Sequence, residues 1–221
     1  MQSRDFEHSA QHFDKCFSIG FASGSEMDEI YSSRYSVYVN EFGFLPENES
    51  NVDIDEFDQD ALHVVVRHRA TGLLAGYFRY VISHGEQALP FAKYLPEAKA
   101  LGTSKSAEVS RLFVSKAFRK RLNDTIYSPV IFRALYLSAS YLHSLIFVGE
   151  TFILAEQRLA RAISNIDLEM VDTNVEVERG HKKRRLYSFC RTGSKTSIDV
   201  EQFHRLFTKT LNVEVTFSQI A

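Results

Sequence analysis

Hydrophobic and polar positions follow two different periods along the chain, and together they predict an alternation of strands and helices. Segments with the alternation or the composition of strands cover residues 15–22, 62–68, 73–82, 107–114, 145–152, 169–177 and 185–189. Apolar residues spaced by three and four predict helices over residues 25–40, 129–144, 155–166 and 199–211, with a short helix over 90–101. This order predicts a layered α/β or α+β sheet with helices on its faces.

Two local motifs refine this pattern. Residues 69–72, Arg-Ala-Thr-Gly, lie between two strand-like runs and are typical of a hairpin turn. Ser25-x-x-Asp28 has the spacing of a capping box and predicts the start of the first helix.

Length and composition restrict the architecture to one domain. The chain has 221 residues, of which 44% are hydrophobic, enough to bury one sizeable core. We expect a single domain over residues 1–195, followed by a helical appendage over residues 196–221. Lys and Arg number 26 against 28 Asp and Glu, and the resulting net charge of −2 argues against bulk nucleic-acid binding.

We expect a cytoplasmic protein without a membrane span. The longest stretch free of Asp, Glu, Lys and Arg, residues 134–149, is shorter than the roughly 18 residues that a span needs. Charged residues stand near the N-terminus where a signal peptide would have its apolar core. Cys16 and Cys190 form neither a disulfide framework nor a metal-ligand motif.

Two arginines stand where the pattern calls for hydrophobic residues. Arg34 has helical spacing to Ile30 and Tyr38, and Arg79 shares a strand face with Tyr77 and Val81. A buried arginine needs an anionic partner. The nearest supply is the loop over residues 47–60, whose acidic side chains are Glu47, Glu49, Asp53, Asp55, Glu56, Asp58 and Asp60.

This acidic loop has alternatives to pairing with arginines. A calcium loop is the first, since Asp53-x-Asp55 matches its opening, but Phe57 takes the third ligand position and Val64 the closing glutamate. We therefore reject a calcium site and expect no metal. A solvated acidic turn stays open.

A third anomaly lies in the apolar run over residues 107–114, which carries both Glu108 and Arg111. By simple alternation Glu108 and Ser110 point one way and Arg111 the other, unless a bulge re-aims them. One inward charge is often a structural ion pair. Three arginines and several carboxylates in the middle of a sheet favour a functional site.

A basic loop follows this run and precedes the helix predicted over residues 129–144. A strand, a basic loop and a helix N-terminus together favour a phosphate group. The candidate residues for phosphopantetheine binding and carrier docking are Ser115, Lys116, Arg119, Lys120 and Arg121. A second basic run, residues 179–185, is either a solvated hairpin turn or part of the same positive face. Glycine-rich nucleotide loops and the HExxH and G-x-S-x-G motifs are absent from the sequence.

These features resemble the autoinducer-synthase-like branch of the GCN5-related N-acyltransferase (GNAT) fold. They are most similar to the long-chain N-acyl amino acid synthases and the acyltransferases associated with exosortase systems. The resemblance spans residues 31–189. Its motifs are Arg34-Tyr-Ser-Val-Tyr38, Glu41-Phe-Gly-Phe-Leu45, Asp55-Glu-Phe-Asp58, Gly76-Tyr-Phe-Arg79 and Glu108-Val-Ser-Arg111-Leu-Phe-Val114. It implies a central mixed, mostly antiparallel sheet flanked by helices.

The resemblance also implies the site. In homoserine lactone synthases the matched positions form a charged cluster beside the acyl-carrier site, here Arg34, Asp55, Asp58, Arg79, Glu108, Ser110 and Arg111. A tryptophan usual in those enzymes has no counterpart, since the chain has none, and Phe44 appears in its region. The acetyl-CoA signature is missing from residues 115–121, and donors in this branch commonly arrive on acyl carrier protein.

The implied reaction is attack of an amino acid's α-amine on a long-chain acyl thioester carried by acyl carrier protein or coenzyme A. Glu108 is the predicted base, with Ser110 and Arg111 beside it, backbone N–H groups for the oxyanion, and one arginine for the substrate carboxylate. No permanently bound cofactor is expected, and the lipid product would form near a membrane. Candidates for acyl-chain contacts, or for core packing, are Phe44, Tyr77, Phe78 and Phe113.

Two other functions stay open. The first is an acyl-homoserine lactone synthase. The second is a non-catalytic protein that binds acyl carriers, in which the charged cluster is only structural.

Overall fold

A computed structural model of the chain describes residues 15–83, 89–93, 106–119, 151–154, 168–179 and 182–191. Its strands are β1 (Phe17–Phe21), β2 (Leu62–His68), β3 (Leu74–Ile82), β4 (Ser106–Val114), β5 (Thr151–Leu154), β6 (Leu168–Arg179) and β7 (Lys182–Arg191). Its helical elements are η1 (Gly24–Glu26), α2 (Met27–Tyr35), the π-helix η2 (Ser36–Glu41), η3 (Pro90–Lys93) and η5 (Lys116–Phe118).

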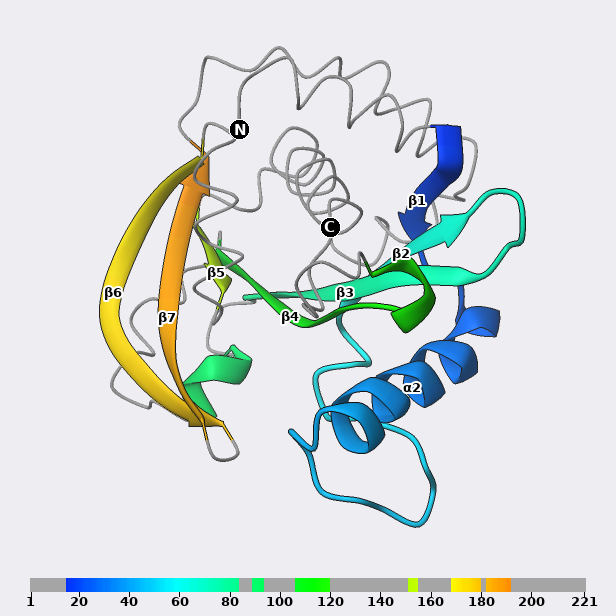
Figure 1. Cartoon of the computed structure of the whole chain (residues 1–221). Helices are drawn as coiled ribbons and strands as arrows, with labels where there is room; N and C mark the ends of the chain where they lie inside the picture. Colours follow the sequence, from blue (N-terminus) through cyan, green and yellow to red (C-terminus); the bar gives the residue numbers. More distant parts are fainter. Residues whose placement is uncertain are drawn as a thin grey trace.

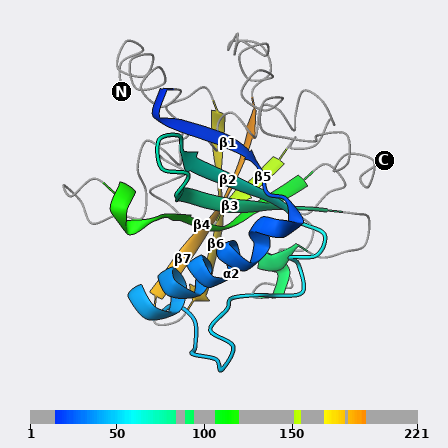
Figure 2. The same cartoon turned by 90° about the vertical axis from the view of Figure 1, so that its right-hand side faces the viewer.

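The strands form one sheet of seven in the order β1-β2-β3-β4-β5-β7-β6. Every neighbouring pair is antiparallel except β4 and β5, which are parallel. This confirms the predicted mixed, mostly antiparallel sheet. Figures 1 and 2 show α2 against one face of the sheet near β2, β3 and β4, with the long β6–β7 hairpin at the opposite end.

The predicted strands are confirmed to within a few residues, with one exception. The run over 145–152 overlaps β5 only at its last two residues, because β5 covers Thr151–Leu154. The predicted hairpin turn is confirmed. Gly72 has φ +71° there, and its N–H donates to the His68 carbonyl at 2.8 Å.

The start of the first helix differs from the prediction. The capping box lies at Ser23 and Glu26, two residues before the Ser25–Asp28 pair, and the Glu26 carboxylate accepts the Ser23 N–H at 2.8 Å. Glu26 also pairs with Arg67 of β2 at 2.7 Å, a tertiary contact that fixes this residue at the helix entry. The helix begins with a 3₁₀ turn at Gly24 and ends in a π-helix at Glu41, one residue beyond the predicted 25–40 range at each end.

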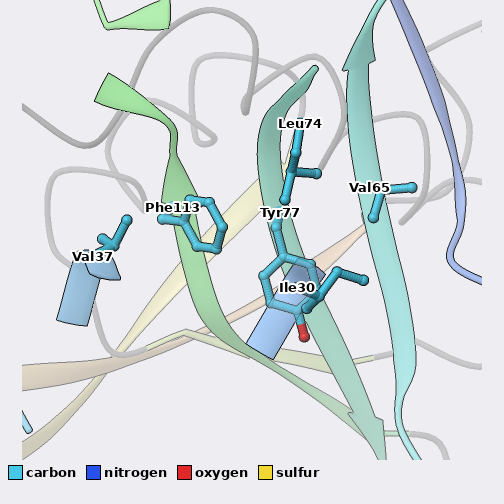
Figure 3. Close-up of a cluster of buried hydrophobic side chains, with 6 residues drawn as sticks. All are labelled: Ile30, Val37, Val65, Leu74, Tyr77 and Phe113. Carbon is cyan, nitrogen blue, oxygen red and sulfur yellow. The ribbon is translucent and has the colours of Figure 1, made fainter. Parts of the chain in front are cut away.

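Helix α2 is joined to the sheet by a compact apolar cluster, shown in Figure 3. The cluster consists of Ile30, Val37, Val65, Leu74, Tyr77 and Phe113. Each of these side chains is buried, and the Tyr77 and Phe113 rings lie 5.5 Å apart. The cluster holds α2 against β2, β3 and β4, beside the acidic loop that follows the helix.

Several predictions fall on other residues. Of the helix predicted over 90–101, the structure describes a 3₁₀ turn at Pro90–Lys93. The helices predicted over 129–144, 155–166 and 199–211, the appendage 196–221, and Lys120 and Arg121 lie outside the described residues, and so does the turn at Gly180. Within the part of the chain that is described, no helix has the length and apolar character of a membrane span. The domain boundaries and the cytoplasmic location stay predictions.

Candidate active site

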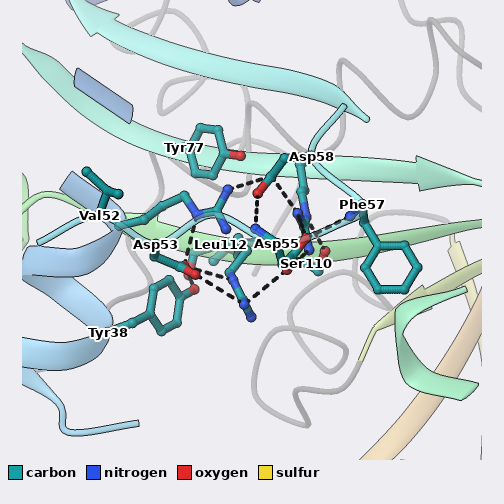
Figure 4. Close-up of polar contacts among 12 residues, drawn as sticks. Tyr38, Val52, Asp53, Asp55, Phe57, Asp58, Tyr77, Ser110 and Leu112 are labelled. Atoms are coloured by element: carbon teal, nitrogen blue, oxygen red, sulfur yellow. Dashed lines mark hydrogen bonds and ion pairs between the residues drawn. The ribbon is translucent and has the colours of Figure 1, made fainter. Parts of the chain in front are cut away.

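The acidic loop supplies partners for the buried arginine of α2. Arg34 is fully buried, and its Nε donates to Asp53 Oδ2 at 3.0 Å while its Nη1 donates to Asp58 Oδ1 at 2.6 Å (Figure 4). The backbone N–H of Asp53 also donates to the Tyr31 carbonyl at 3.2 Å, which fastens the loop to α2. The sequence-based expectation that the loop neutralises Arg34 is therefore confirmed, and the alternative of a freely solvated turn is wrong for these aspartates.

Arg79 of β3 joins the same carboxylates from the sheet side. Its Nη1 and Nη2 donate to the two oxygens of Asp55 at 2.6 and 2.7 Å, and Nη1 also donates to Asp58 Oδ1 at 2.5 Å. Its Nε donates to Ser110 Oγ at 3.0 Å. Because every nitrogen of this guanidinium is bonded, Arg79 holds the acidic loop and β4 in place relative to β3.

Arg111 reaches the cluster through a bulge in β4. Tyr77 pairs with Phe113 and Arg79 pairs with Ser110, so two residues of β4, including Arg111, are placed against one of β3. Arg111 has φ +53°, in the left-handed region, and its Nε lies 2.9 Å from Asp53 Oδ2 and its Nη2 3.1 Å from Asp55 Oδ2. The bulge therefore brings Arg111 and Ser110 to one cluster. Simple alternation would have pointed them to opposite faces, and a bulge was the exception stated in the sequence analysis.

Two contributors were missed in the sequence. Asp53 bridges Arg34 and Arg111, although the family motif covers only Asp55 and Asp58. The feature of the sequence that could have identified Asp53 was its position two residues before Asp55 in the acidic loop. His63 stands opposite Arg79 in the β2–β3 register and is buried, so a polar residue at a core position of a strand was the available signal.

His63 connects the acidic loop to Tyr77 of β3 by hydrogen bonds from its two ring nitrogens. Its Nε2 lies 2.9 Å from the Asp58 carbonyl, an acceptor only, so Nε2 carries the proton and Nδ1 accepts from the Tyr77 hydroxyl at 2.8 Å. Burial lowers the pKa of His63, and burial raises the pKa of Tyr77. Both groups are therefore neutral near pH 7.

The cluster contains three arginines and three aspartates and is neutral as a whole. Burial alone would raise the pKa of Asp55, but hydrogen bonds and charge from Arg79, with the charge of Arg111, outweigh it and lower this pKa to about 2. Burial opposes the charge of Arg34 as well, yet Tyr77, Asp53 and Asp58 raise its pKa. Asp55 and Arg34 are thus ionised at neutral pH.

Glu108 lies at the end of the pairing described between β4 and β5. It pairs with Ile153 in the last register pair between β4 and β5, and residues 109–114 of β4 continue without a described partner on that side. Its side chain is buried, and Oε2 accepts the Phe91 N–H of η3 at 2.7 Å. The predicted base therefore lies at the last register pair described between the two parallel strands, with its carboxylate bonded to η3.

The predicted acyl-chain residues lie in different places. Tyr77 and Phe113 belong to the apolar cluster under α2, and Phe78 is fully buried with its ring 5.5 Å from Tyr80. Phe44 is half-buried and stacks on Phe42 with 5.3 Å between ring centroids. Core packing accounts for Tyr77 and Phe113, and an acyl-chain role for any of the four stays a prediction.

The basic loop after β4 contributes side chains of two kinds. Lys116 is exposed, whereas Ser115 Oγ donates to the Leu74 carbonyl at 2.6 Å. Arg119 is bonded to Glu41 and to the Val114 carbonyl. A groove of about 560 Å³ separates the loop from the helical segment and is lined by Ser33, Ser36, Val37, Asn40, Glu41, Phe113, Ser115 and Lys116.

Comparison with known proteins bears on this arrangement. Residues 33–128 match the acetyltransferase (GNAT) domain. No curated protein matches the chain. Among solved structures, the chain is similar to MesI, a CoA-dependent acyl-homoserine lactone synthase, with 18% identity over 86% of this chain and 95% of that one and a TM-score of 0.60.

Two further structures have the same fold. BjaI, a CoA-dependent acyl-homoserine lactone synthase solved with SAM and isopentyl-CoA, is 12% identical, covers 86% of this chain and 89% of its own, and has a TM-score of 0.61. A putative N-acetyltransferase from Lactobacillus plantarum is 13% identical, covers 78% and 97%, and has a TM-score of 0.52.

These matches confirm the predicted resemblance at the level of domain and fold, and they support an acyltransferase enzyme. Residues 33–128 are therefore similar to the acetyltransferase (GNAT) domain, and the chain has the acyl-CoA N-acyltransferase fold that the acyl-homoserine lactone synthases MesI and BjaI also have.

Proposed function

We propose that the protein transfers a long-chain acyl group from a phosphopantetheine thioester to the α-amine of an amino acid. The observation that carries this proposal is the pair of opposite charges at the accessible side of the cluster. The side chains of Arg34 and Arg79 are 0% exposed, whereas those of Arg111 and Asp55 are 13% and 20% exposed. One cation and one anion, paired with each other at 3.1 Å, are thus the members of the cluster that a ligand can reach.

A free amino acid is complementary to this pair. Its carboxylate suits the guanidinium of Arg111, and its ammonium group suits Asp55, whose low pKa keeps it charged. A simple amine would satisfy only Asp55, and a simple fatty acid only Arg111. A zwitterion satisfies both and leaves the cluster neutral.

The chemistry then needs a base. An α-ammonium group with a pKa of about 8 must lose a proton before its nitrogen attacks the thioester carbonyl. We assign this proton to Glu108, which lies three residues before Arg111 on β4. Glu108 passes this first proton to water. The nitrogen then forms the new C–N bond, the C–S bond breaks, and Glu108 takes the second proton lost by the nitrogen and returns it to the leaving thiolate. Backbone N–H groups of β4 after Glu108 would stabilise the oxyanion, an effect typically worth about 3 kcal/mol per donor.

The donor side rests on the basic loop. The groove beside Ser115 and Lys116 offers polar walls and one exposed lysine to the phosphopantetheine arm. Coenzyme A and acyl carrier protein share this arm, and MesI and BjaI are described as CoA-dependent. We propose acyl carrier protein as the partner, with Lys116, Lys120 and Arg121 as the docking cations.

An acyl-homoserine lactone synthase is the second candidate, since MesI and BjaI have this activity and this fold. S-adenosylmethionine, with which BjaI was solved, is also an α-amino acid, so the charge pair suits either reaction. The sequence favours the N-acyl amino acid product, because Phe44 stands in the region of the missing tryptophan.

One experiment separates the possibilities. The purified chain is incubated with palmitoyl acyl carrier protein or palmitoyl-CoA and, in separate arms, with the twenty amino acids or S-adenosylmethionine. Mass spectrometry then searches for N-palmitoyl amino acids, or for a lactone with methylthioadenosine. We expect the first product. The second would establish the lactone synthase instead, and absence of both with every donor would favour a binding protein.

A further inference from the structure

The second basic run of the sequence lies at the end of the β6–β7 hairpin, beyond the rest of the sheet. β7 pairs with β5 through residues 187–189. Its residues 182–185 pair with residues 176–179 of β6, and the described part of the sheet has no strand on their other side. Residues 176–185 therefore form a two-stranded arm that extends past the last register pair of β5.

The arm is basic, and the register shows which of its charges are balanced. Residues 176–185 contain five Lys and Arg against two Glu, a net charge of +3 with His counted as neutral. Residues that pair across a hairpin share one of its faces. Glu176 pairs with Arg185. Glu178 pairs with Lys183 on the same face, so the charges on this face sum to zero.

The other face of the arm carries the whole surplus. Arg184 pairs there with Val177. Arg179 pairs with Lys182, so two cations stand opposite each other without a carboxylate in the register. We call the face formed by Arg179, Lys182 and Arg184 the cationic face. Like charges directly opposite each other destabilise a hairpin, so a partner that brings negative charge is favoured here.

The cationic face belongs to the face of the sheet that carries Glu108. Glu108 pairs with Ile153 of β5, and Ile153 pairs with Ser188 of β7. Residues paired across neighbouring strands share a face. Alternation along β7 then places Arg184 and Lys182 on the face of Ser188, and so on that of Glu108.

β6 gives the same assignment independently. Val171 pairs with Ser188 and shares its face. By alternation Val177 and Arg179 lie on this face too, and the register irregularity between Val171 and Val177 leaves the assignment unchanged. Both strands therefore place the surplus charge on the same side of the sheet as the candidate site.

The arm and the basic loop after β4 extend towards the same end of the sheet. β4 and β5 are parallel and β7 is antiparallel to β5, so the end of β4 and the start of β7 point the same way. Arg184 and Lys182 stand four and six residues from Ser188, about 13 and 20 Å along β7 at the usual rise of a strand. Figures 1 and 2 show this end of the hairpin on the side of the sheet that α2 covers.

These distances exclude the acceptor as the partner of the cationic face. An amino acid held by Asp55 and Arg111 is too short to bridge them. A phosphopantetheine thioester has its phosphate at the end opposite the thioester, and on acyl carrier protein, an acidic protein, the protein surface begins at that phosphate. A membrane is less favoured, because binding to a lipid surface also needs apolar residues and the cationic face has only Val177.

We propose that the cationic face, Arg179, Lys182 and Arg184, docks the acidic surface of acyl carrier protein while the thioester of the donor lies at Glu108. The inference rests on the function proposed above. It adds a second group of cations to those of the basic loop and assigns docking to one face of the arm only. Opposite charges arranged in this way speed the encounter and fix its orientation.

Two double variants with equal loss of charge test the inference. Lys182→Gln with Arg184→Gln removes two cations from the cationic face. Its control, Lys183→Gln with Arg185→Gln, removes two cations from the opposite face of the same arm. Each leaves the arm with a net charge of +1, so only the face differs. Circular dichroism and urea unfolding check that both variants fold like the wild type.

The first measurement is binding of S-hexadecyl acyl carrier protein, a thioether that cannot react. The second is steady-state kinetics with palmitoyl acyl carrier protein and with palmitoyl pantetheine, which has neither phosphate nor protein. We expect the Lys182/Arg184 variant to raise the carrier Kd and KM about five- to tenfold at low salt, the effect of two exposed ion pairs. High salt should reduce the difference. The pantetheine KM, and every value for the control, should change less than about twofold.

The outcomes separate this inference from the proposed function. Equal weakening by both double variants would mean that net charge alone matters, and no weakening by either would mean that the arm is not involved; each result overturns the inference. A wild type that binds the carrier, with weaker binding only in the Lys182/Arg184 variant, but makes no N-acyl amino acid leaves the docking role and removes the proposed reaction. A wild type that acylates amino acids from palmitoyl-CoA but does not bind the carrier overturns the inference alone.

Phosphatidylglycerol vesicles test the other macromolecular partner. The Lys182/Arg184 variant should bind them as the control does. If this variant alone loses binding to the vesicles while its carrier Kd is unchanged, the cationic face is a membrane contact and the inference is overturned.

Discussion

Removing the charge of Asp58 should cost the protein a large part of its stability. The Asp58 side chain is 2% exposed, and its Oδ1 accepts from Arg34 at 2.6 Å and from Arg79 at 2.5 Å. Its Oδ2 accepts the Asp55 N–H at 2.8 Å. Asp58→Asn keeps the shape but leaves two buried guanidinium groups facing a neutral amide. Breaking a buried pair in this way costs about 3–5 kcal/mol.

The assay is urea unfolding followed by circular dichroism, with the free energy of unfolding and the m-value both fitted. Asp60→Asn is the matched control, because Asp60 is exposed and lies two residues further along the same loop. It should change the free energy of unfolding by no more than about 0.5 kcal/mol. A loss below about 1 kcal/mol for Asp58→Asn, at an unchanged m-value, would show that the arginines do not depend on this carboxylate.

Three further predictions follow from the site. Glu108→Gln should lower kcat by about 100-fold or more while substrate binding persists, and unchanged turnover would remove Glu108 from the chemistry. The folded pKa of Asp55, about 2, lies below its usual value of 3.8, so the stability from its ionised form is present above pH 3.8 and is lost as pH falls towards 2. Unfolding curves from pH 5 to pH 2 should therefore fall less steeply for Asp55→Asn than for the wild type, and parallel curves would contradict the assignment. His63 has a lowered pKa, so stability should rise with pH up to about 6.5 as the unfolded chain loses its extra proton; His63→Asn should flatten this rise, and an unchanged slope would place the titration elsewhere.

The sequence predicted the parts of the fold that depend on local pattern. The β2 and β3 strands and their turn were predicted closely, because period-two runs around a glycine-containing turn are strong local signals. The helix entry was misplaced, since Glu26 is selected there by its tertiary pairing with Arg67 as well as by local spacing. Strand β5 was misplaced too, because it is only four residues long and lies between β4 and β7 in the sheet, where a strand need not show the alternation of one with a solvent face.

The site residues likewise divide into those that the local pattern identified and those that only tertiary contacts reveal. Arg34 and Arg79 were identified because a charge at a core position contradicts the hydrophobic pattern. Asp53 could not be singled out from the other acidic residues of the loop, since only the folded register brings it within 3.0 Å of Arg34 and 2.9 Å of Arg111. Arg119 was grouped with the docking cations because the sequence showed a basic run and not its partner, Glu41, 78 positions away.

The β4 bulge connects the charged cluster to the proposed chemistry. A left-handed conformation at Arg111, a residue with a side chain, costs about 1–2 kcal/mol, and the ion pairs to Asp53 and Asp55 offset that cost. The cluster is neutral, so it has no surplus charge with which to hold an anion as a whole. Instead, its ion pairs stabilise the bulge at Arg111. The bulge in turn sets the orientation of the β4 backbone between Glu108 and the basic loop. Since the acidic loop supplies both ion pairs, a change in Asp53 or Asp55 should disturb the β4 backbone whose N–H groups are proposed to stabilise the oxyanion, even though neither residue lies on that strand.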